Sequence, residues 1–200
     1  MLKMAVFVSG GGTNLQSLID HTQNGDIQGE IVLVVSNRKN AYGLERARKA
    51  GIPAECIKDQ DVLMQRLKEK EVDFIVLAGY LAIIPDEMIN VYHNRIMNIH
   101  PSLIPSFCGP GFYGLHVHEH AFNRGVKVSG ATVHFVSNVV DGGPIILQEA
   151  IDVSHAETPE QMQETVLTVE HRLLPTAVKL YCEGKIKVEN ERVKILWEER

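Results

Sequence analysis

The segment 74–78, Phe-Ile-Val-Leu-Ala, carries no polar side chain on either of its two faces. An extended segment that is apolar on both faces must be covered on both sides, which is typical of a central strand in a parallel sheet flanked by helices. Other short strand patterns alternate with amphipathic helical patterns along the chain. The sequence therefore predicts an α/β fold.

The strand and helix patterns follow one another as expected for consecutive βαβ units. The predicted strands cover 4–8, 30–35, 53–57, 74–78, 96–99, 129–136 and 145–153, and a small hairpin ends the chain. The predicted helices begin near residue 14 and then cover 41–50, 62–70, 86–92, 115–124 and 159–183. We predict a doubly wound, mostly parallel, Rossmann-like sheet with an antiparallel C-terminal extension.

Composition narrows the classes of partner. The 200 residues are 44% hydrophobic, which is enough for one compact domain, and the net charge of -5 gives no general reason to bind nucleic acid or an anionic membrane. Cys56, Cys108 and Cys182 show no CxxC spacing, so neither a disulfide framework nor a zinc knuckle is indicated. The first apolar run is too short to span a bilayer. We expect a cytoplasmic protein that acts on small molecules.

A glycine-rich turn, residues 9–14 (SGGGTN), follows the first strand and opens the first helix. Free N–H groups at such a helix start favour a phosphate group. The alternative is a tight turn that needs glycine dihedrals, with Thr13 or Asn14 as the helix N-cap. Leu15 stands where a dinucleotide fingerprint needs glycine, and no Walker lysine follows, so a monophosphate is the simpler ligand.

Asn98 and His100 alternate on one predicted strand, so their side chains point to the same side at the end of the sheet where ligands collect. The alternative is a structural hydrogen-bonded pair. The proline-rich turn that follows fixes the direction of the backbone, with Ile104–Pro105 either cis or trans.

The stretch 141–144 (DGGP) is typical of a turn between two strands, and Asp141 could simply cap that turn. Alternatively, this loop delivers a carboxylate to His100. A carboxylate beside an imidazole raises its pKa, and the resulting cation could stabilise an oxyanion.

Two other features invite a chemical interpretation. His116 and His120 could share a helix face, but the spacing is not HExxH and no third metal ligand follows. Cys108 lies among glycines, which indicates a loop and not an activated thiolate at a helix start. We expect neither a metal site nor a cysteine nucleophile.

A set of motifs carries a resemblance to a known family. They are 9–14 (SGGGTN), 43–47 (GLERA), 77–80 (LAGY), 98–103 (NIHPSL), and 133–136 (VHFV) leading to 141–144 (DGGP). On these motifs the chain resembles, over essentially its whole length, the phosphoribosylglycinamide formyltransferases, which are folate-dependent enzymes of purine synthesis. The resemblance implies transfer of a formyl group from 10-formyltetrahydrofolate, a reduced folate, to the amine of glycinamide ribonucleotide by direct attack through a tetrahedral oxyanion, without a metal.

The resemblance also implies roles for individual residues. The catalytic trio would be Asn98, His100 and Asp141. The ribonucleotide would contact Gly12, Thr13, Asn14 and Glu170. The folate would contact Leu81, Ala82, Ile83, Ile84, Asn98, Val136, Val139, Val140 and Asp141. One formyltransferase domain would cover 1–200, with a ribonucleotide-phosphate half at about 1–100 and a folate-binding and catalytic-loop half at about 101–200.

Two departures from the family pattern stand out. Many relatives carry an arginine where this chain has Ala82, and the stretch 107–114 is longer than the commonest form. The oligomeric state stays open, and a homodimer is compatible with the pattern.

Other functions remain to be distinguished. A formyltetrahydrofolate hydrolase or a methionyl-tRNA formyltransferase would share the Asn/His/Asp chemistry, but each is expected to carry an added domain. A nucleotide-binding module without catalysis would need the phosphate turn and not the trio. A reductase that uses NADP is a further alternative.

Overall fold

The computed structural model describes residues 1–196 and contains a seven-stranded sheet in the order β3-β2-β1-β4-β5-β6-β7. The strands are β1 (Leu2–Val8), β2 (Gly29–Ser36), β3 (Ala54–Cys56), β4 (Phe74–Leu77), β5 (Ile96–His100), β6 (Val128–Phe135) and β7 (Ile145–Asp152). The first five strands in chain order are mutually parallel, whereas β6 runs antiparallel to both β5 and β7. A separate hairpin pairs β8 (Ile186–Glu189) with β9 (Arg192–Ile195).

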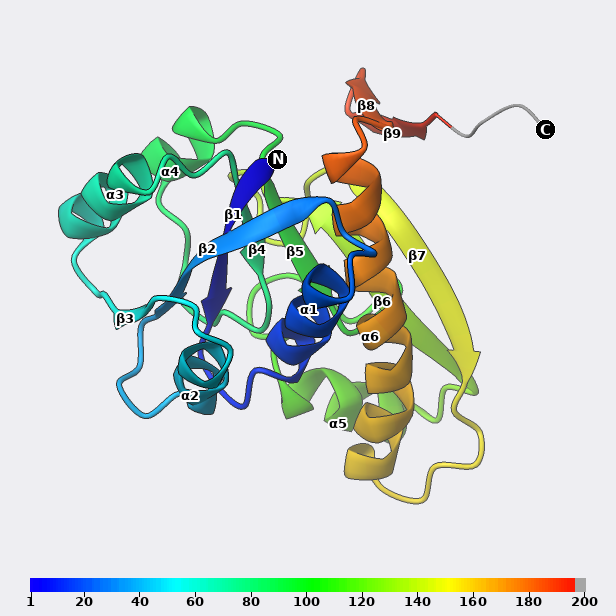
Figure 1. Ribbon diagram of the computed structural model, residues 1–200. Helices are drawn as coiled ribbons and strands as arrows, with labels where there is room; N and C mark the ends of the chain where they lie inside the picture. Colours follow the sequence, from blue (N-terminus) through cyan, green and yellow to red (C-terminus); the bar gives the residue numbers. More distant parts are fainter. Residues whose placement is uncertain (197–200) are drawn as a thin grey trace.

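Helices cover both faces of the sheet (Figure 1). They are α1 (Thr13–Gln23), α2 (Tyr42–Lys49), α3 (Gln60–Glu69), α4 (Asp86–Val91), α5 (Leu115–Arg124) and α6 (Pro159–Cys182). Apolar side chains of α1, α2, α5 and α6 pack into one core cluster, and those of α3 and α4 pack into a second cluster on the opposite face. The prediction of a doubly wound sheet with an antiparallel extension is confirmed, and the element boundaries differ by a few residues.

The all-apolar strand behaves as its sequence predicts. All four residues of β4 are buried, with Phe74 and Val76 in one core cluster and Ile75 and Leu77 in the other. This two-sided burial is what an apolar run without alternation requires.

The direction of strand addition reverses between β1 and β4. From β1 the sheet grows outward through β2 and β3, and then on the other side through β4 and β5. The carboxyl ends of strands at such a reversal form a crevice in which α/β proteins bind ligands. The glycine-rich turn after β1 and the end of β5 both lie at this edge.

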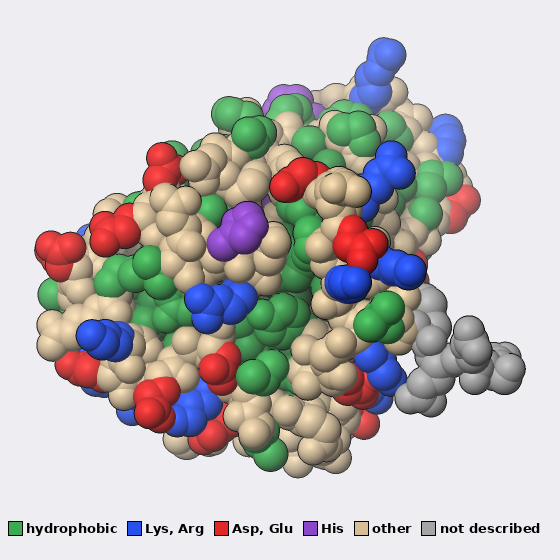
Figure 2. Space-filling view, turned by 90° about the horizontal axis from the view of Figure 1, so that it is seen from above, with side chains coloured by type: hydrophobic (Ala, Val, Ile, Leu, Met, Phe, Trp, Pro, Cys, Tyr) green, Lys and Arg blue, Asp and Glu red, His purple; other side chains and the backbone are tan. Residues whose placement is uncertain are grey.

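A hollow of about 600 Å³ lies elsewhere, around the amino ends of β1 and β2, and includes Lys3, Glu30 and Glu71 in its lining. The upper face of the molecule mixes acidic and basic side chains with hydrophobic ones (Figure 2). In residues 1–196, no helix combines the length and the apolar character needed to cross a membrane.

Candidate active site

Asn98 of β5 and His134 of β6 are directly paired residues of the antiparallel ladder. The Asn98 side-chain Nδ2 lies 3.1 Å from His134 Nε2. His134 Nδ1 lies 2.8 Å from the Phe135 carbonyl oxygen, which can only accept, so Nδ1 carries a hydrogen. His134 Nε2 therefore accepts one Asn98 hydrogen, and this bond sets the direction of the amide.

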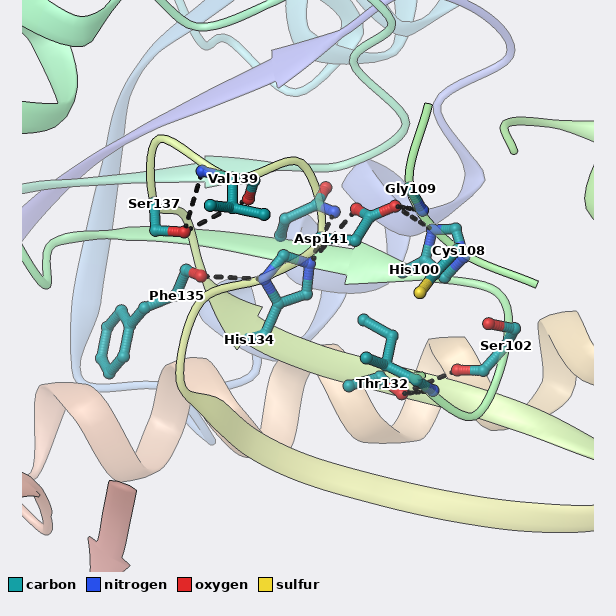
Figure 3. Close-up of polar contacts among 12 residues, drawn as sticks. His100, Ser102, Cys108, Gly109, Thr132, His134, Phe135, Ser137, Val139 and Asp141 are labelled. Atoms are coloured by element: carbon teal, nitrogen blue, oxygen red, sulfur yellow. Dashed lines mark hydrogen bonds and ion pairs between the residues drawn. The ribbon is translucent and has the colours of Figure 1, made fainter. Parts of the chain in front are cut away.

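The loop between β6 and β7 brings Asp141 to the same place (Figure 3). Its carboxylate oxygens lie 3.6 Å from His100 Nδ1 and 3.6 Å from His134 Nε2. Asp141 itself has φ +54°, and a Cβ on Gly143 would come within 1.9 Å of the Phe135 carbonyl oxygen. The DGGP turn can thus press against the end of β6 only because glycine stands at that position.

The structure therefore brings together the three residues predicted as a trio. His134 links Asn98 to Asp141, and Asp141 lies beside His100. Sequence reasoning missed His134 as a member of this cluster. The signal that could have found it is the motif VHFV on a strand antiparallel to the Asn98 strand, but the register of that pairing was needed.

His100 is buried, and its Nε2 lies 2.9 Å from the Phe107 carbonyl oxygen. Since a carbonyl only accepts, Nε2 carries a hydrogen and Nδ1 faces Asp141. Burial lowers the pKa of His100, and Asp141 and the Phe107 carbonyl raise it without reversing the net decrease. The net shift of the His100 pKa is thus opposite to the increase expected from Asp141, because the cost of burying a charge outweighs the carboxylate.

Burial also raises the pKa of Asp141. The proximity of His134 and His100 and the hydrogen bond from the Gly109 amide together outweigh burial, so the net pKa is lower than usual. The Gly109 amide donates to Asp141 Oδ2 at 2.8 Å. Asp141 is therefore held as a carboxylate.

Hydrogen bonds from a side chain of β6 hold the turn that follows β5. Thr132, which pairs with His100 in the ladder, donates its hydroxyl to the Ser102 carbonyl at 2.7 Å and accepts from the Ile104 amide at 3.2 Å. The Ile104–Pro105 peptide bond is cis. The direction of the chain after His100 is thus set by side-chain bonds as well as by the prolines.

The glycine-rich turn leaves the start of α1 open. The N-cap of α1 is Gly12, with φ +72°, and no side chain caps the helix. The alternative in which Thr13 or Asn14 serves as the cap is therefore wrong, and the first backbone N–H groups stay free of a side-chain cap. A Cβ on Gly12 would lie 2.6 Å from Gly43 Cα, so α2 presses directly against the turn.

Asn14 connects this turn to α6. Its Nδ2 donates to Glu170 Oε2 at 2.7 Å, and its buried Oδ1 has no hydrogen-bond partner within the described residues. Burial raises the pKa of Glu170, which the Asn14 bond only partly offsets. The predicted ribonucleotide residues Gly12, Thr13, Asn14 and Glu170 thus lie together around the start of α1.

Hydrophobic residues predicted to contact folate are largely exposed. Leu81 and Ile83 are 42% and 85% exposed, and Val139 and Val140 are 67% and 50% exposed. Ala82 is half-buried, Val136 packs partly against the α3–α4 core cluster, and Ile84 is buried in that cluster. Four apolar side chains of the two predicted folate stretches are therefore open to a ligand.

The histidines of α5 that could have suggested a metal site have local hydrogen-bond partners instead. His116 Nδ1 lies 2.8 Å from Glu119 Oε2, and His120 Nδ1 lies 2.7 Å from the His116 carbonyl oxygen. Burial raises the pKa of the Cys108 thiol, which disfavours a thiolate. Within residues 1–196, no three His, Cys, Asp or Glu side chains gather as metal ligands.

The fold and these contacts correspond to one class of protein. Residues 2–178 match the formyl transferase family. The chain thus combines a formyltransferase fold with an Asn/His/Asp cluster at the carboxyl end of its sheet.

The relatives narrow this class. The chain is 36% identical to the phosphoribosylglycinamide formyltransferase of Haemophilus influenzae, over 95% of this chain and 92% of that protein. It is 39% identical to the chloroplastic enzyme of the same name from Arabidopsis thaliana, over 97% of this chain and 70% of that protein. The crystal structure of glycinamide ribonucleotide transformylase 1 from Symbiobacterium toebii superposes with a TM-score of 0.91 at 42% identity, covering 98% of this chain and 94% of that one. The chain belongs to the phosphoribosylglycinamide formyltransferase family.

Proposed function

We propose that this chain transfers the formyl group of 10-formyltetrahydrofolate to the amine of glycinamide ribonucleotide. The observation that carries the proposal is the contact chain from Asn98 through His134 and Asp141 to His100, at the edge of the sheet that also holds the uncapped start of α1. The start of α1 is suited to bind a phosphate, and the Asn/His/Asp cluster is suited to catalyse an acyl transfer.

The ribonucleotide phosphate binds at the start of α1, on the backbone of Gly12, Thr13 and Asn14. Free N–H groups and the positive end of the helix dipole favour an anion there. The glycinamide end reaches Asn14 and Glu170, where the unpartnered Asn14 Oδ1 accepts an N–H from the ligand. Burial raises the pKa of Glu170 in the ligand-free protein.

Folate lies along the exposed apolar side chains of 81–84 and 136–141. Burial of this apolar surface contributes to affinity. In this proposal residues 1–100 mainly hold the ribonucleotide and residues 101–200 supply the catalytic loop, with the Asn14–Glu170 bond joining the two halves.

The reaction begins when the neutral amine attacks the formyl carbon. A nitrogen–carbon bond forms and the carbonyl oxygen becomes negative. One Asn98 hydrogen is bonded to His134, so the second amide hydrogen is free to stabilise this oxygen. A single preorganised donor of this kind is worth about 3 to 4 kcal/mol of barrier.

His100 and Asp141 stabilise the charge of the intermediate and transfer its proton. The developing oxyanion, together with Asp141, raises the pKa of His100 from its lowered ligand-free value, so His100 takes up on Nδ1 the proton that the attacking amine loses and stabilises the intermediate as a cation. The carbon–N10 bond then breaks. His100 returns this proton, with Asp141 as relay, to N10 of the departing folate, and the formyl carbonyl forms again on the acceptor nitrogen.

A transfer assay with three acceptors tests this proposal. A formyl-folate is incubated with glycinamide ribonucleotide, with the same amide lacking the phosphate, or with water alone. We expect turnover to require the phosphorylated acceptor. Release of formate without any acceptor would indicate a hydrolase, and ribonucleotide binding without turnover would indicate a nucleotide-binding module.

A further inference from the structure

The loop between β5 and α5 contacts both His100 and Asp141 through its backbone. Figure 3 shows its Gly109 beside Asp141. The Phe107 carbonyl accepts from His100 Nε2 at 2.9 Å, and the Gly109 amide donates to Asp141 Oδ2 at 2.8 Å. The same Asp141 oxygen lies 3.6 Å from His100 Nδ1. Two backbone groups of one short segment therefore orient the imidazole and the carboxylate relative to each other.

This segment has an unusual backbone conformation that its neighbours must hold. Phe107 has φ +49°, a value that a residue with a side chain rarely adopts. Its amino-terminal side is tied down by Ser102, whose hydroxyl donates to the Ser106 carbonyl at 2.6 Å. The carboxyl-terminal side is tied through the Phe112 amide, which donates to the Gly109 carbonyl at 3.1 Å.

The ring of Phe112 connects the loop to α5. Its centroid lies 6.3 Å from the Phe107 ring and 5.0 Å from the His120 ring, and both contacts are edge-on. His120 is itself fixed by the bond between its Nδ1 and the His116 carbonyl. The His120 ring, which is anchored on α5, thus packs against Phe112. Phe112 in turn packs against Phe107, whose carbonyl accepts the hydrogen bond from His100. Edge-to-face geometry of this kind is specific in direction.

We propose that Phe112 is a positioning residue for the formyl transfer. Its ring, between Phe107 and His120, keeps the Phe107 carbonyl on His100 Nε2, and thereby keeps Nδ1 directed to Asp141. Without this acceptor, the neutral imidazole can carry its hydrogen on either nitrogen. The kinetic consequence rests on the proposed function, whereas the effect on the His100 ring does not.

Two measurements on the whole chain test the inference. The ring nitrogens of His100 are observed by ¹⁵N NMR without substrate, and kcat and KM are measured in the transfer assay. In Phe112→Ala we expect His100 to change from the Nε2–H form to a mixture of both forms. We expect kcat to fall roughly 10- to 100-fold, because small misplacements of a catalytic group cost about that much, with KM for the ribonucleotide within about twofold.

Matched variants separate positioning from general damage. Phe112→Tyr keeps the ring, and we expect it to retain the parental His100 nitrogen signals and the parental kcat. Tyr113→Ala removes the neighbouring exposed ring, which packs against His116, and is expected to resemble the parent protein. Phe112→Leu keeps most of the side-chain volume but has no aromatic edge. The two measurements are made on this variant if the alanine variant fails to fold.

The outcomes are distinct. Unchanged His100 nitrogens in both Phe112→Ala and Phe112→Leu would overturn the inference. A changed His100 with unchanged kcat would also overturn it. If the parent protein shows no transfer but His100 still responds to Phe112, the positioning of the ring stands and the proposed function fails.

Discussion

Asn98 and His134 face each other across β5 and β6, and their side chains are joined by a 3.1 Å hydrogen bond. This bond uses one hydrogen of the Asn98 amide and leaves the other available, at the edge of the sheet where His100 and Asp141 also lie. The functional roles of the cluster can be tested residue by residue.

Replacing His134 with alanine removes the acceptor that orients Asn98 and a partner of Asp141. We expect kcat to fall roughly 10- to 100-fold, because the amide is then free to rotate away from the developing oxyanion. Steady-state kinetics measure the effect. His155→Ala is the control, because its side chain is exposed and, among residues 1–196, has polar contacts with Asp152 and Thr165 only. An equal loss in both variants would refute the orienting role.

Asn98→Ala removes the proposed oxyanion donor itself. The expected loss in kcat is about 100- to 1000-fold, and the Kd of the ribonucleotide should change little, because the phosphate binds at a different turn. Single-turnover kinetics and calorimetric binding check the two quantities. A variant that loses ribonucleotide affinity and keeps its chemical rate would place Asn98 in binding.

Gly12→Ala tests the phosphate turn. Gly12 has φ +72°, and a Cβ would meet the backbone of α2 at 2.6 Å, so we expect a loss of about 1 to 3 kcal/mol in unfolding free energy together with weaker ribonucleotide binding. Gly10→Ala is the matched control, since nothing lies within 4 Å of its Cβ position. Denaturant unfolding and calorimetry measure both effects, and equal losses in the two variants would argue against the cradle at Gly12.

His118 predicts a pH dependence of stability. Burial, with a smaller effect of His100, lowers the pKa of His118 to about 4, and its Nδ1 has no partner in the described part of the chain. Below its ordinary pKa of about 6.5 the unfolded chain binds the proton more readily, so unfolding free energy is lost as pH falls toward about 4, on the order of 3 kcal/mol from this group. Urea unfolding of the parent and of His118→Gln should converge over this window. A constant difference between them would contradict the assignment.

Much of the fold follows from local sequence, because the apolar run of β4 and the alternating helical patterns reflect burial on known faces. The alternation of Asn98 and His100 likewise predicts that they share one side of β5. The approach of Asp141 depends on how the β6–β7 loop folds back, and the role of His134 depends on the register between β5 and β6. Neither the conformation of this loop nor the register of the two strands can be read from the spacing of neighbouring residues. Here the family resemblance supplied the proximity of Asp141.

The net shift of the His100 pKa also lies beyond local sequence. The neighbouring carboxylate suggested an increase, and the structure gives a decrease because the ring is almost completely enclosed. The Phe107 carbonyl that binds Nε2 depends on a left-handed residue in the loop, which a sequence without glycine at that position does not suggest.

The central claim is that His100 acts in the chemical step and not in ribonucleotide binding. The most direct measurement compares His100→Asn with the parent protein for the Kd of glycinamide ribonucleotide by calorimetry and for the rate of formyl transfer in a single turnover. We expect a Kd within about twofold of the parent and a transfer rate lower by about 100-fold or more. Transfer at the parental rate, or a loss confined to ribonucleotide affinity, would contradict it.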